Sequence, residues 1–270
     1  MASGKSARSV WFSRCRKLTD RKPPGIVPSV GYSYQVFAVD FAELKRLGKG
    51  DQALYEKLAP GCAEQIESVQ EYLDEAFEFA QDDEDDDSGG GFFGAVASIF
   101  GKKKEKEPPK PAPALGDKPI TGEEALRHLI LGGDFVSYGG TAYGYLFESI
   151  CEQIGESMDN EGWCSLRSSS NWDGEIEKAL KKSGVKFPFR ENLMGRGGPI
   201  DFPQGDDFPY MGHFSPEECK EFAKELANLD PAAAGKLTIE AEYGEISIRN
   251  LKKWMDHCAA SNLGLVTFYY

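Results

Sequence analysis

The chain has 270 residues, 40% of them apolar and 28% charged, which is enough apolar material for the core of a globular protein. Its net charge of −13 argues against a surface that binds nucleic-acid phosphates, and no run approaches the ~18 apolar residues of a membrane-spanning helix. Residues 1–30 hold seven basic side chains and one acidic one, so the remaining residues carry 24 basic and 43 acidic side chains. This acidic body indicates a solvated surface or attraction of a basic protein partner.

The basic arm at residues 1–30 lacks the continuous apolar segment of a secretory signal. Its composition also fits a mitochondrial-type presequence, and a start site assigned too early is the simpler hypothesis. Periodic structure begins only at Val30-Gly31-Tyr32. We therefore expect a disordered arm ahead of the folded domain.

In chain order, Ser33 to Val39 is rich in β-forming residues and predicts a buried strand. Asp40 and Asp51 are expected to cap two short helices. Apolar residues then recur at spacings of three and four from Cys62 to Ala80, which predicts one long amphipathic helix.

Residues 81–117 break this pattern with an acidic run, a run of three glycines, a run of three lysines and several prolines, a composition typical of a disordered insertion. The insertion carries an apolar island that includes Phe92, Phe93, Ile99 and Phe100. Such an island can be a docking peptide, or a weak membrane-surface anchor helped by the lysines that follow. The alternative is that the island folds back onto the domain.

After the insertion, Thr121 and Glu124 match the pattern of a capping box, and the next helix is expected to begin at Thr141. Asp173 is predicted to cap a short helix. Residues 185–189 predict a short strand and residues 190–214 a long ordered loop.

Ser215, Pro216 and Glu218 form the best-specified helix start in the chain. Residues 237–243 alternate weakly like a strand, and a final helix through Cys258 precedes a strand at 264–270. A strand at the end of a chain must join a sheet to be ordered. We therefore expect an α+β fold: one domain of residues 31–80 and 118–270, with the terminal strands in one mixed sheet and several amphipathic helices.

Four of the six cysteines, Cys62, Cys151, Cys219 and Cys258, fall on apolar helix faces, and no C-x-x-C pair occurs. This pattern predicts buried free thiols and a reducing, cytoplasmic compartment rather than disulfides or a zinc site. No cofactor fingerprint occurs, and only three histidines are present, so we predict neither a cofactor nor a metal.

The first candidate site is the loop at residues 206–213, which holds Asp206, Asp207, Tyr210 and His213. An Asp–His pair can act as a general base, or it can fix the loop by hydrogen bonds. His128 and His257 lie in predicted amphipathic helices and are interpreted as structural or surface residues.

Trp163 and Arg167 form the second candidate, because tryptophan and arginine are favoured at binding hot spots. The alternative is that Trp163 and Trp172 pack in the core while Arg167 pairs with carboxylates.

Three segments carry a family resemblance: residues 124–132, a helix ending in a Leu-Leu-x-Gly-like turn; 208–226, a loop before a Ser-Pro-Glu-Glu helix start; and 250–270, a closing helix and strand. In these segments the chain resembles the YfbM-like bacterial proteins, a group of domains of unknown function. Residues 31–44 also resemble the start of related actinobacterial and planctomycete-type proteins. The shared motifs are structural, so the resemblance implies a bacterial domain and transfers no catalytic residue.

Together these observations favour a cytoplasmic, non-enzymatic protein-binding factor of the immunity or accessory type, with a basic protein as partner and no nucleic acid. One alternative is a small-molecule-binding protein or hydrolase-like enzyme that uses the 206–213 loop. Another is a peripheral scaffold, weakly associated with a membrane, that acts through residues 92–104.

Overall fold

The computed structural model describes residues 34–85, 118–158, 171–205 and 209–270. All of them belong to one compact unit, Tyr32–Tyr270; the other unit is Met1–Gly31. The insertion was predicted to begin at residue 81, but residues 81–85 are helical, so this boundary is wrong. The predicted disorder of residues 1–30 and 86–117 lies outside the described residues, as does the apolar island of Phe92, Phe93, Ile99 and Phe100.

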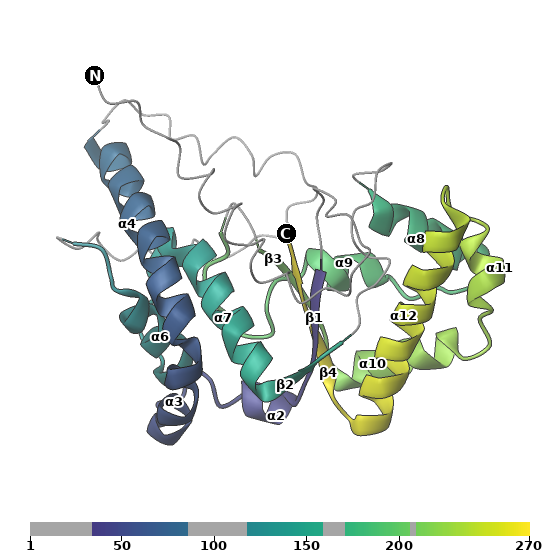
Figure 1. The fold of residues 1–270 in the computed structure, drawn as a ribbon, viewed down its shortest axis with the longest axis horizontal. Helices are drawn as coiled ribbons and strands as arrows, with labels where there is room; N and C mark the ends of the chain where they lie inside the picture. The colour runs from purple at the N-terminus through teal and green to yellow at the C-terminus, as the bar shows by residue number, and fades with distance from the viewer. Residues whose placement is uncertain (1–33, 86–117, 159–170, 206–208) are drawn as a thin grey trace, which may run out of the picture. The chain divides into compact units, whose positions relative to one another are not determined.

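A four-stranded sheet forms the centre of the described unit, in the order β2-β1-β4-β3 (Figure 1). Its strands are β1 (Tyr34–Val39), β2 (Gly155–Ser157), β3 (Tyr210–Phe214) and β4 (Gly264–Tyr269). β1 and β4 pair along their whole length, so the prediction of an α+β fold with these two strands in one sheet is confirmed. The sheet was expected to be mixed, but every pairing among the described strands is antiparallel.

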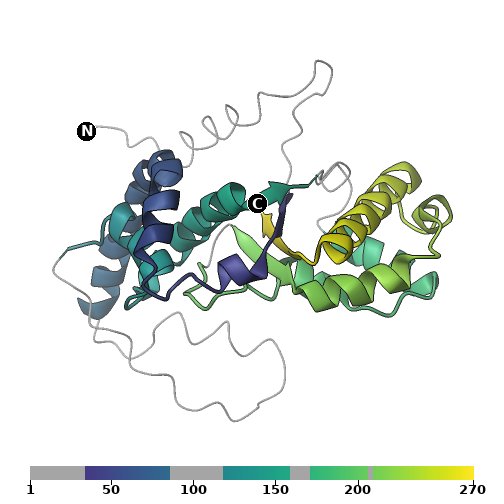
Figure 2. The same cartoon turned by 90° about the horizontal axis from the view of Figure 1, so that it is seen from below.

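The sheet is buried on both faces, which explains the nearly continuous apolar runs in β1 and β4. Successive side chains of a strand point to opposite faces. Tyr34, Val36 and Ala38 therefore face one helical layer, with which they share a hydrophobic core, while Phe37 and Val39 face the other. The two layers lie on either side of the sheet in both views (Figures 1 and 2).

The first helical layer precedes β2 in the chain. Its long helices pack on one another, and α7 also contacts β1 and β2. The elements are α2 (Phe41–Leu44), α3 (Gln52–Leu58), η1 (Ala59–Cys62), α4 (Ala63–Asp85), α6 (Gly122–Leu131), η2 (Ser137–Gly139) and α7 (Gly140–Ile154).

Side-chain caps fix the starts of three helices in this layer. Asp40 and Asp51 accept hydrogen bonds from the backbone amides of Ala42 and Leu54, at 2.7 and 3.0 Å, and Thr121 forms the predicted capping box with Glu124. These three predictions are confirmed. Helix α7 begins at Gly140 without a side-chain cap, one residue before the predicted start at Thr141.

The second layer contains α8 (Trp172–Lys182), α9 (Phe189–Met194), α10 (Pro216–Leu226), α11 (Pro231–Gly235) and α12 (Ala241–Ser261). Ser215 and Glu218 form the predicted capping box of α10. Helix α12 packs on α10 and α11, and its Trp254 and Met255 are buried in the core shared with the sheet. His128 and His257 lie within α6 and α12, as expected.

Four predictions for this half of the chain are wrong. Residues 185–188 are irregular and lead into α9, so there is no strand at 185–189. The expected loop at 190–214 contains most of α9 and all of β3. Strand β3 packs closely on α9 at Gly212, because a Cβ there would lie only 2.2 Å from the carbonyl oxygen of Asn192 in α9.

The third error is the strand at 237–243, which is a turn followed by the start of α12. Asp173 is also not a cap: α8 begins one residue earlier, at Trp172, and Asp173 is a buried first-turn residue bonded to Tyr34. The Asp173 side chain, which the sequence pattern assigned to helix capping, thus bonds to a distant residue in the core instead.

Candidate functional site

The structure places Tyr210 and His213 in strand β3 rather than in a loop. They are three residues apart, so their side chains point to opposite faces of the sheet. Their cross-strand neighbours on β4 are Tyr269 and Val266, respectively. Tyr210 and His213 therefore do not form one site. Asp206 and Asp207 lie outside the described residues, and so do Trp163 and Arg167.

His213 holds a neighbouring loop in place. Its Nδ1 lies 2.9 Å from the carbonyl oxygen of Gly197, which can only accept, so this nitrogen carries the proton. The amide of Gly197 donates in turn to the carbonyl of Met211 at 3.0 Å. Burial lowers the pKa of His213 and favours the neutral ring. His213 therefore makes a loop-fixing hydrogen bond to Gly197, while its pairing with Asp206 or Asp207, which lie outside the described residues, stays a prediction.

Three tyrosines form a row across the sheet, which we call the tyrosine row: Tyr34 on β1, Tyr269 on β4 and Tyr210 on β3. The ring centroids of Tyr34 and Tyr269 are 4.8 Å apart, and those of Tyr269 and Tyr210 are 6.5 Å apart. Exposure rises along the row, from a fully buried Tyr34 to Tyr210 at 40%. Tyrosine at such an edge combines an apolar ring with a polar tip, a combination favoured at interfaces.

A buried carboxyl group lies at the inner end of the tyrosine row. The hydroxyl of Tyr34 donates to Asp173 at 3.0 Å, and both side chains are buried. Burial raises the pKa of Asp173 to about 6, although the hydrogen bond from Tyr34 and the charge of Arg190 both lower it. The pair ties the start of α8 to β1.

A second tyrosine–carboxyl pair lies on the opposite side of the sheet, where the hydroxyl of Tyr270 donates to Glu148 of α7. The ring of Tyr145 stacks on that of Tyr270 at 6.0 Å. Burial, followed by the charge of Glu152, raises the pKa of Glu148 to about 8. This carboxyl group is therefore largely protonated at neutral pH.

The turn between α11 and α12, together with the start of α12, exposes three large apolar side chains. We call this surface the apolar turn: Leu237 at 43%, Ile239 at 56% and, on α12, Tyr243 at 38%. The hydroxyl of Thr238 donates to the carbonyl of Gly235 at 2.7 Å and lies 3.1 Å from that of Glu240. These contacts hold the turn in a defined shape.

Close packing also fixes the apolar turn, since a Cβ at Gly244 would lie 2.3 Å from the Thr238 hydroxyl. Sequence reasoning missed this surface because its alternation was interpreted as a strand. The sequence does contain a signal for this region: Asp230 as N-cap and Pro231 at N1 predict a short helix just before the turn.

Cys62, Cys151, Cys219 and Cys258 are buried free thiols, as predicted. Within the described ranges, no group of three or more His, Cys, Asp or Glu side chains is placed to hold a metal ion. In the same residues, no helix combines the length and the apolar character that crossing a membrane requires.

Comparison with known proteins places the chain in a family without an assigned function. A family described as "Domain of unknown function (DUF7691)" matches residues 110–270, more than half of the chain. Nothing in this match connects the chain to the YfbM-like proteins in particular. No curated protein and no solved structure matches the chain.

Proposed function

Since the chain belongs to the DUF7691 family of domains of unknown function, we propose on physical grounds that it is a non-enzymatic binding protein whose apolar turn docks a basic protein. The observation that carries this proposal is the exposure of Leu237, Ile239 and Tyr243 within seven residues that span the turn and the start of α12. A contiguous exposed apolar patch on a folded domain typically marks an interaction surface.

Charge around the apolar turn supports a basic partner. Glu240 and Glu242 flank Ile239 and Tyr243, against a single lysine at position 236. The net charge of −13 would attract a basic protein over longer distances and raise its association rate. The turn would then supply the apolar contacts that hold the complex, because buried apolar and aromatic anchors carry most of the binding free energy at interfaces.

The test compares full-length protein with the double variant Leu237→Ser/Ile239→Ser. Both side chains are exposed in the free protein, so the variant is expected to keep the fold and the net charge. A basic protein captured from native lysate by the wild type should be purified and its dissociation constant measured. We expect the double variant to bind it at least about tenfold more weakly, equivalent to about 1.4 kcal/mol, and higher salt to slow association.

Phe79→Ser provides the matched control, because Phe79 is 73% exposed on α4, which belongs to the first helical layer. Its binding should equal that of the wild type. The proposal is wrong if the partner binds the double variant as tightly as the wild type, or if Phe79→Ser weakens binding equally. It is also wrong if the turn proves to join two copies of this chain.

The buried free thiols support placing the protein in a reducing compartment such as the cytoplasm. An immunity or accessory role, and a scaffold role through residues 92–104, stay predictions. An enzyme that uses residues 206–213 would need groups beyond Tyr210 and His213, since these two face opposite sides of the sheet.

A further inference from the structure

Two adjoining hollows form a groove on the first helical layer and the loop before β3. The first hollow has a volume of about 380 Å³ and is lined by residues that include Lys45, Lys49, Leu129 and Phe135. The second, of about 310 Å³, is lined by the loop at residues 196–204. Ile200 and Asp201 line both, so the two hollows adjoin.

The lining of the first hollow is net positive, although the protein is acidic. Lys45 and Lys49 are exposed on its rim, and Asp201 is the single carboxylate that lines it. No ion pair among the described residues involves either lysine. Two ammonium groups at one rim favour an anionic ligand.

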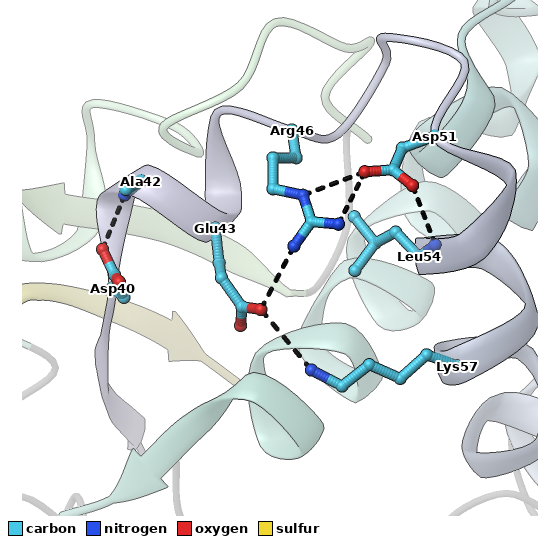
Figure 3. A network of polar contacts seen from close by, with 7 residues as sticks. All are labelled: Asp40, Ala42, Glu43, Arg46, Asp51, Leu54 and Lys57. Atoms are coloured by element: carbon cyan, nitrogen blue, oxygen red, sulfur yellow. Dashed lines mark hydrogen bonds and ion pairs between the residues drawn. The ribbon is translucent and has the colours of Figure 1, made fainter.

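A polar network holds the loop that carries both lysines (Figure 3). Arg46 binds Asp51 at 2.7 Å and Glu43 at 3.5 Å, and Glu43 also pairs with Lys57 at 3.4 Å. The charge of Arg46 is thus neutralised by local carboxylates. The network ties α2 to the start of α3, and Lys45 and Lys49, which line the first hollow, take no part in it.

Glycines bring this loop against the end of α6. The amide of Gly48 donates to the carbonyl of Ile130 at 3.0 Å. Gly132 has a φ of 85°, and a Cβ there would lie 2.6 Å from the carbonyl oxygen of Gly48. A side chain at Gly132 would therefore be both strained and obstructed, so the groove wall depends on glycine.

The apolar side of the groove is equally well fixed. Leu129 is buried, and Phe135 packs against the rings of His128, Tyr143 and Phe202 at centroid distances of 5.0 to 6.3 Å. In the second hollow, His213 binds the carbonyl of Gly197 and so positions the loop at 196–204. The walls are therefore organised before any ligand arrives, which lowers the entropic cost of binding.

We propose that this groove binds a small organic anion with an apolar body. Lys45 and Lys49 hold the anionic group, either a carboxylate or a phosphate, and the apolar part lies against Phe135 and Ile200. A volume of about 380 Å³ falls within the range of small-ligand pockets, roughly 300–1,000 Å³. This site is separate from the apolar turn, so either proposal can fail without the other.

The experiment titrates isotope-labelled full-length protein with phenyl phosphate, benzoate and neutral benzyl alcohol and follows the amide resonances of Gly48, Gly132 and Gly133. We expect one or both anions to shift these three signals in a saturable manner, with benzyl alcohol binding at least about tenfold more weakly. The stronger of the two anions identifies the phosphate or carboxylate class.

The variant Lys45→Gln/Lys49→Gln should raise the dissociation constant of the better anion at least about tenfold. The matched control Lys182→Gln/Lys253→Gln removes the same charge from two exposed lysines on α8 and α12 and should bind as the wild type does. The proposal is overturned if benzyl alcohol binds as well as the anions, if neither anion shifts the glycine signals, or if both double variants lose affinity equally.

Discussion

The two faces of the sheet carry the same kind of tyrosine–carboxyl pair, fully buried at Asp173 and partly buried at Glu148, in different electrostatic surroundings. Glu148 on one face and Asp173 on the other each accept a hydrogen bond from a tyrosine hydroxyl. Burial raises the pKa of both, but Glu152 raises that of Glu148 further, whereas Tyr34 and Arg190 lower that of Asp173. Desolvation therefore sets the direction of the change in pKa, while neighbouring groups decide how large it is.

The largest expected effect tests whether the two faces belong to one cooperative unit. Phe222 stacks on Phe187 at 4.6 Å beneath one face, and Phe147 packs on Phe268 at 5.9 Å on the other. Because both rings are fully buried, Phe222→Ala and Phe147→Ala should each lower the free energy of unfolding by about 3–5 kcal/mol.

Urea unfolding followed by circular dichroism and by tryptophan fluorescence checks this prediction. A shared sheet should give one transition with both probes, at a lower midpoint and with an unchanged denaturant slope. Two separate transitions in either variant would show that the helical layers unfold independently, and the faces could not then be compared as parts of one unit.

The second prediction concerns Glu148, whose pKa rises from an ordinary value of 4.5 to about 8. Below about pH 4.5 the carboxyl is protonated in both states, and the stabilisation of the neutral form is complete. As pH rises toward 8, the unfolded chain loses this proton first, so the free energy of unfolding falls by up to ~1.4 kcal/mol per pH unit.

Glu148→Gln removes this titration while keeping the shape of the side chain. Unfolding free energies measured between pH 5 and 8.5 should therefore fall less steeply in the variant, which becomes the more stable protein at the alkaline end. Glu152→Gln is the control: Glu148 then keeps its proton-linked slope, with a lower pKa because one neighbouring charge is gone. Parallel pH curves for wild type and Glu148→Gln would contradict the assignment.

The third prediction places Asp173 in a lower and narrower window, between its ordinary value of 3.8 and about 6. Its folded-state pKa is also raised, so stability is lost as pH rises through this window and is constant, for this group, above it. Asp173→Asn should remove a fall of about 2–3 kcal/mol between pH 4 and 6.5.

Tyr34→Phe sharpens the comparison with Glu148. It removes the hydroxyl that lowers the pKa of Asp173, so the proton-linked fall in stability should extend to higher pH, toward the behaviour of Glu148. Carbon-detected titration of the Asp173 carboxyl gives the pKa directly. A pKa that stays at its wild-type value would show that the Tyr34 hydroxyl does not set the difference between the two faces.

Local signals made much of this fold predictable, and long-range contacts account for what was missed. The capping residues Asp40, Asp51, Thr121 and Ser215 act within three residues of themselves, so their roles follow from sequence. Asp173 has the same local signal, but its partner Tyr34 is 139 residues away. A pattern within one segment cannot reveal such a partner.

The candidate site was harder to predict for the same reason. Tyr210 and His213 are close in sequence, but strand alternation separates them, and the strand is defined by its pairing with β4. At residues 237–243 a strand was predicted where the structure has a turn and a helix start, because a few alternating residues in a turn resemble a strand. In the groove, Lys45 and Ile200 come together only through tertiary packing.

The smallest expected effects compare one capping box from each helical layer. Thr121 accepts from the amide of Glu124 at 3.1 Å, and Ser215 accepts from that of Glu218 at 3.2 Å. Thr121→Ala and Ser215→Ala should each cost about 1 kcal/mol of stability, since each leaves one helix amide without its partner.

The two glutamates of these boxes should differ, because only Glu218 also binds Arg196, at 2.6 Å, in the loop that lines the groove. That ion pair is partly exposed, so Glu218→Ala should cost more than Glu124→Ala by about 0.5 kcal/mol or less. Thermal unfolding at low salt measures this difference in stability. Arg196→Ala, made in the wild type and in Glu218→Ala, completes a double-mutant cycle that isolates the energy of the ion pair. If the cycle shows no coupling, the two boxes are equivalent, and the loop at 196–204 is held by His213 rather than by the helix start.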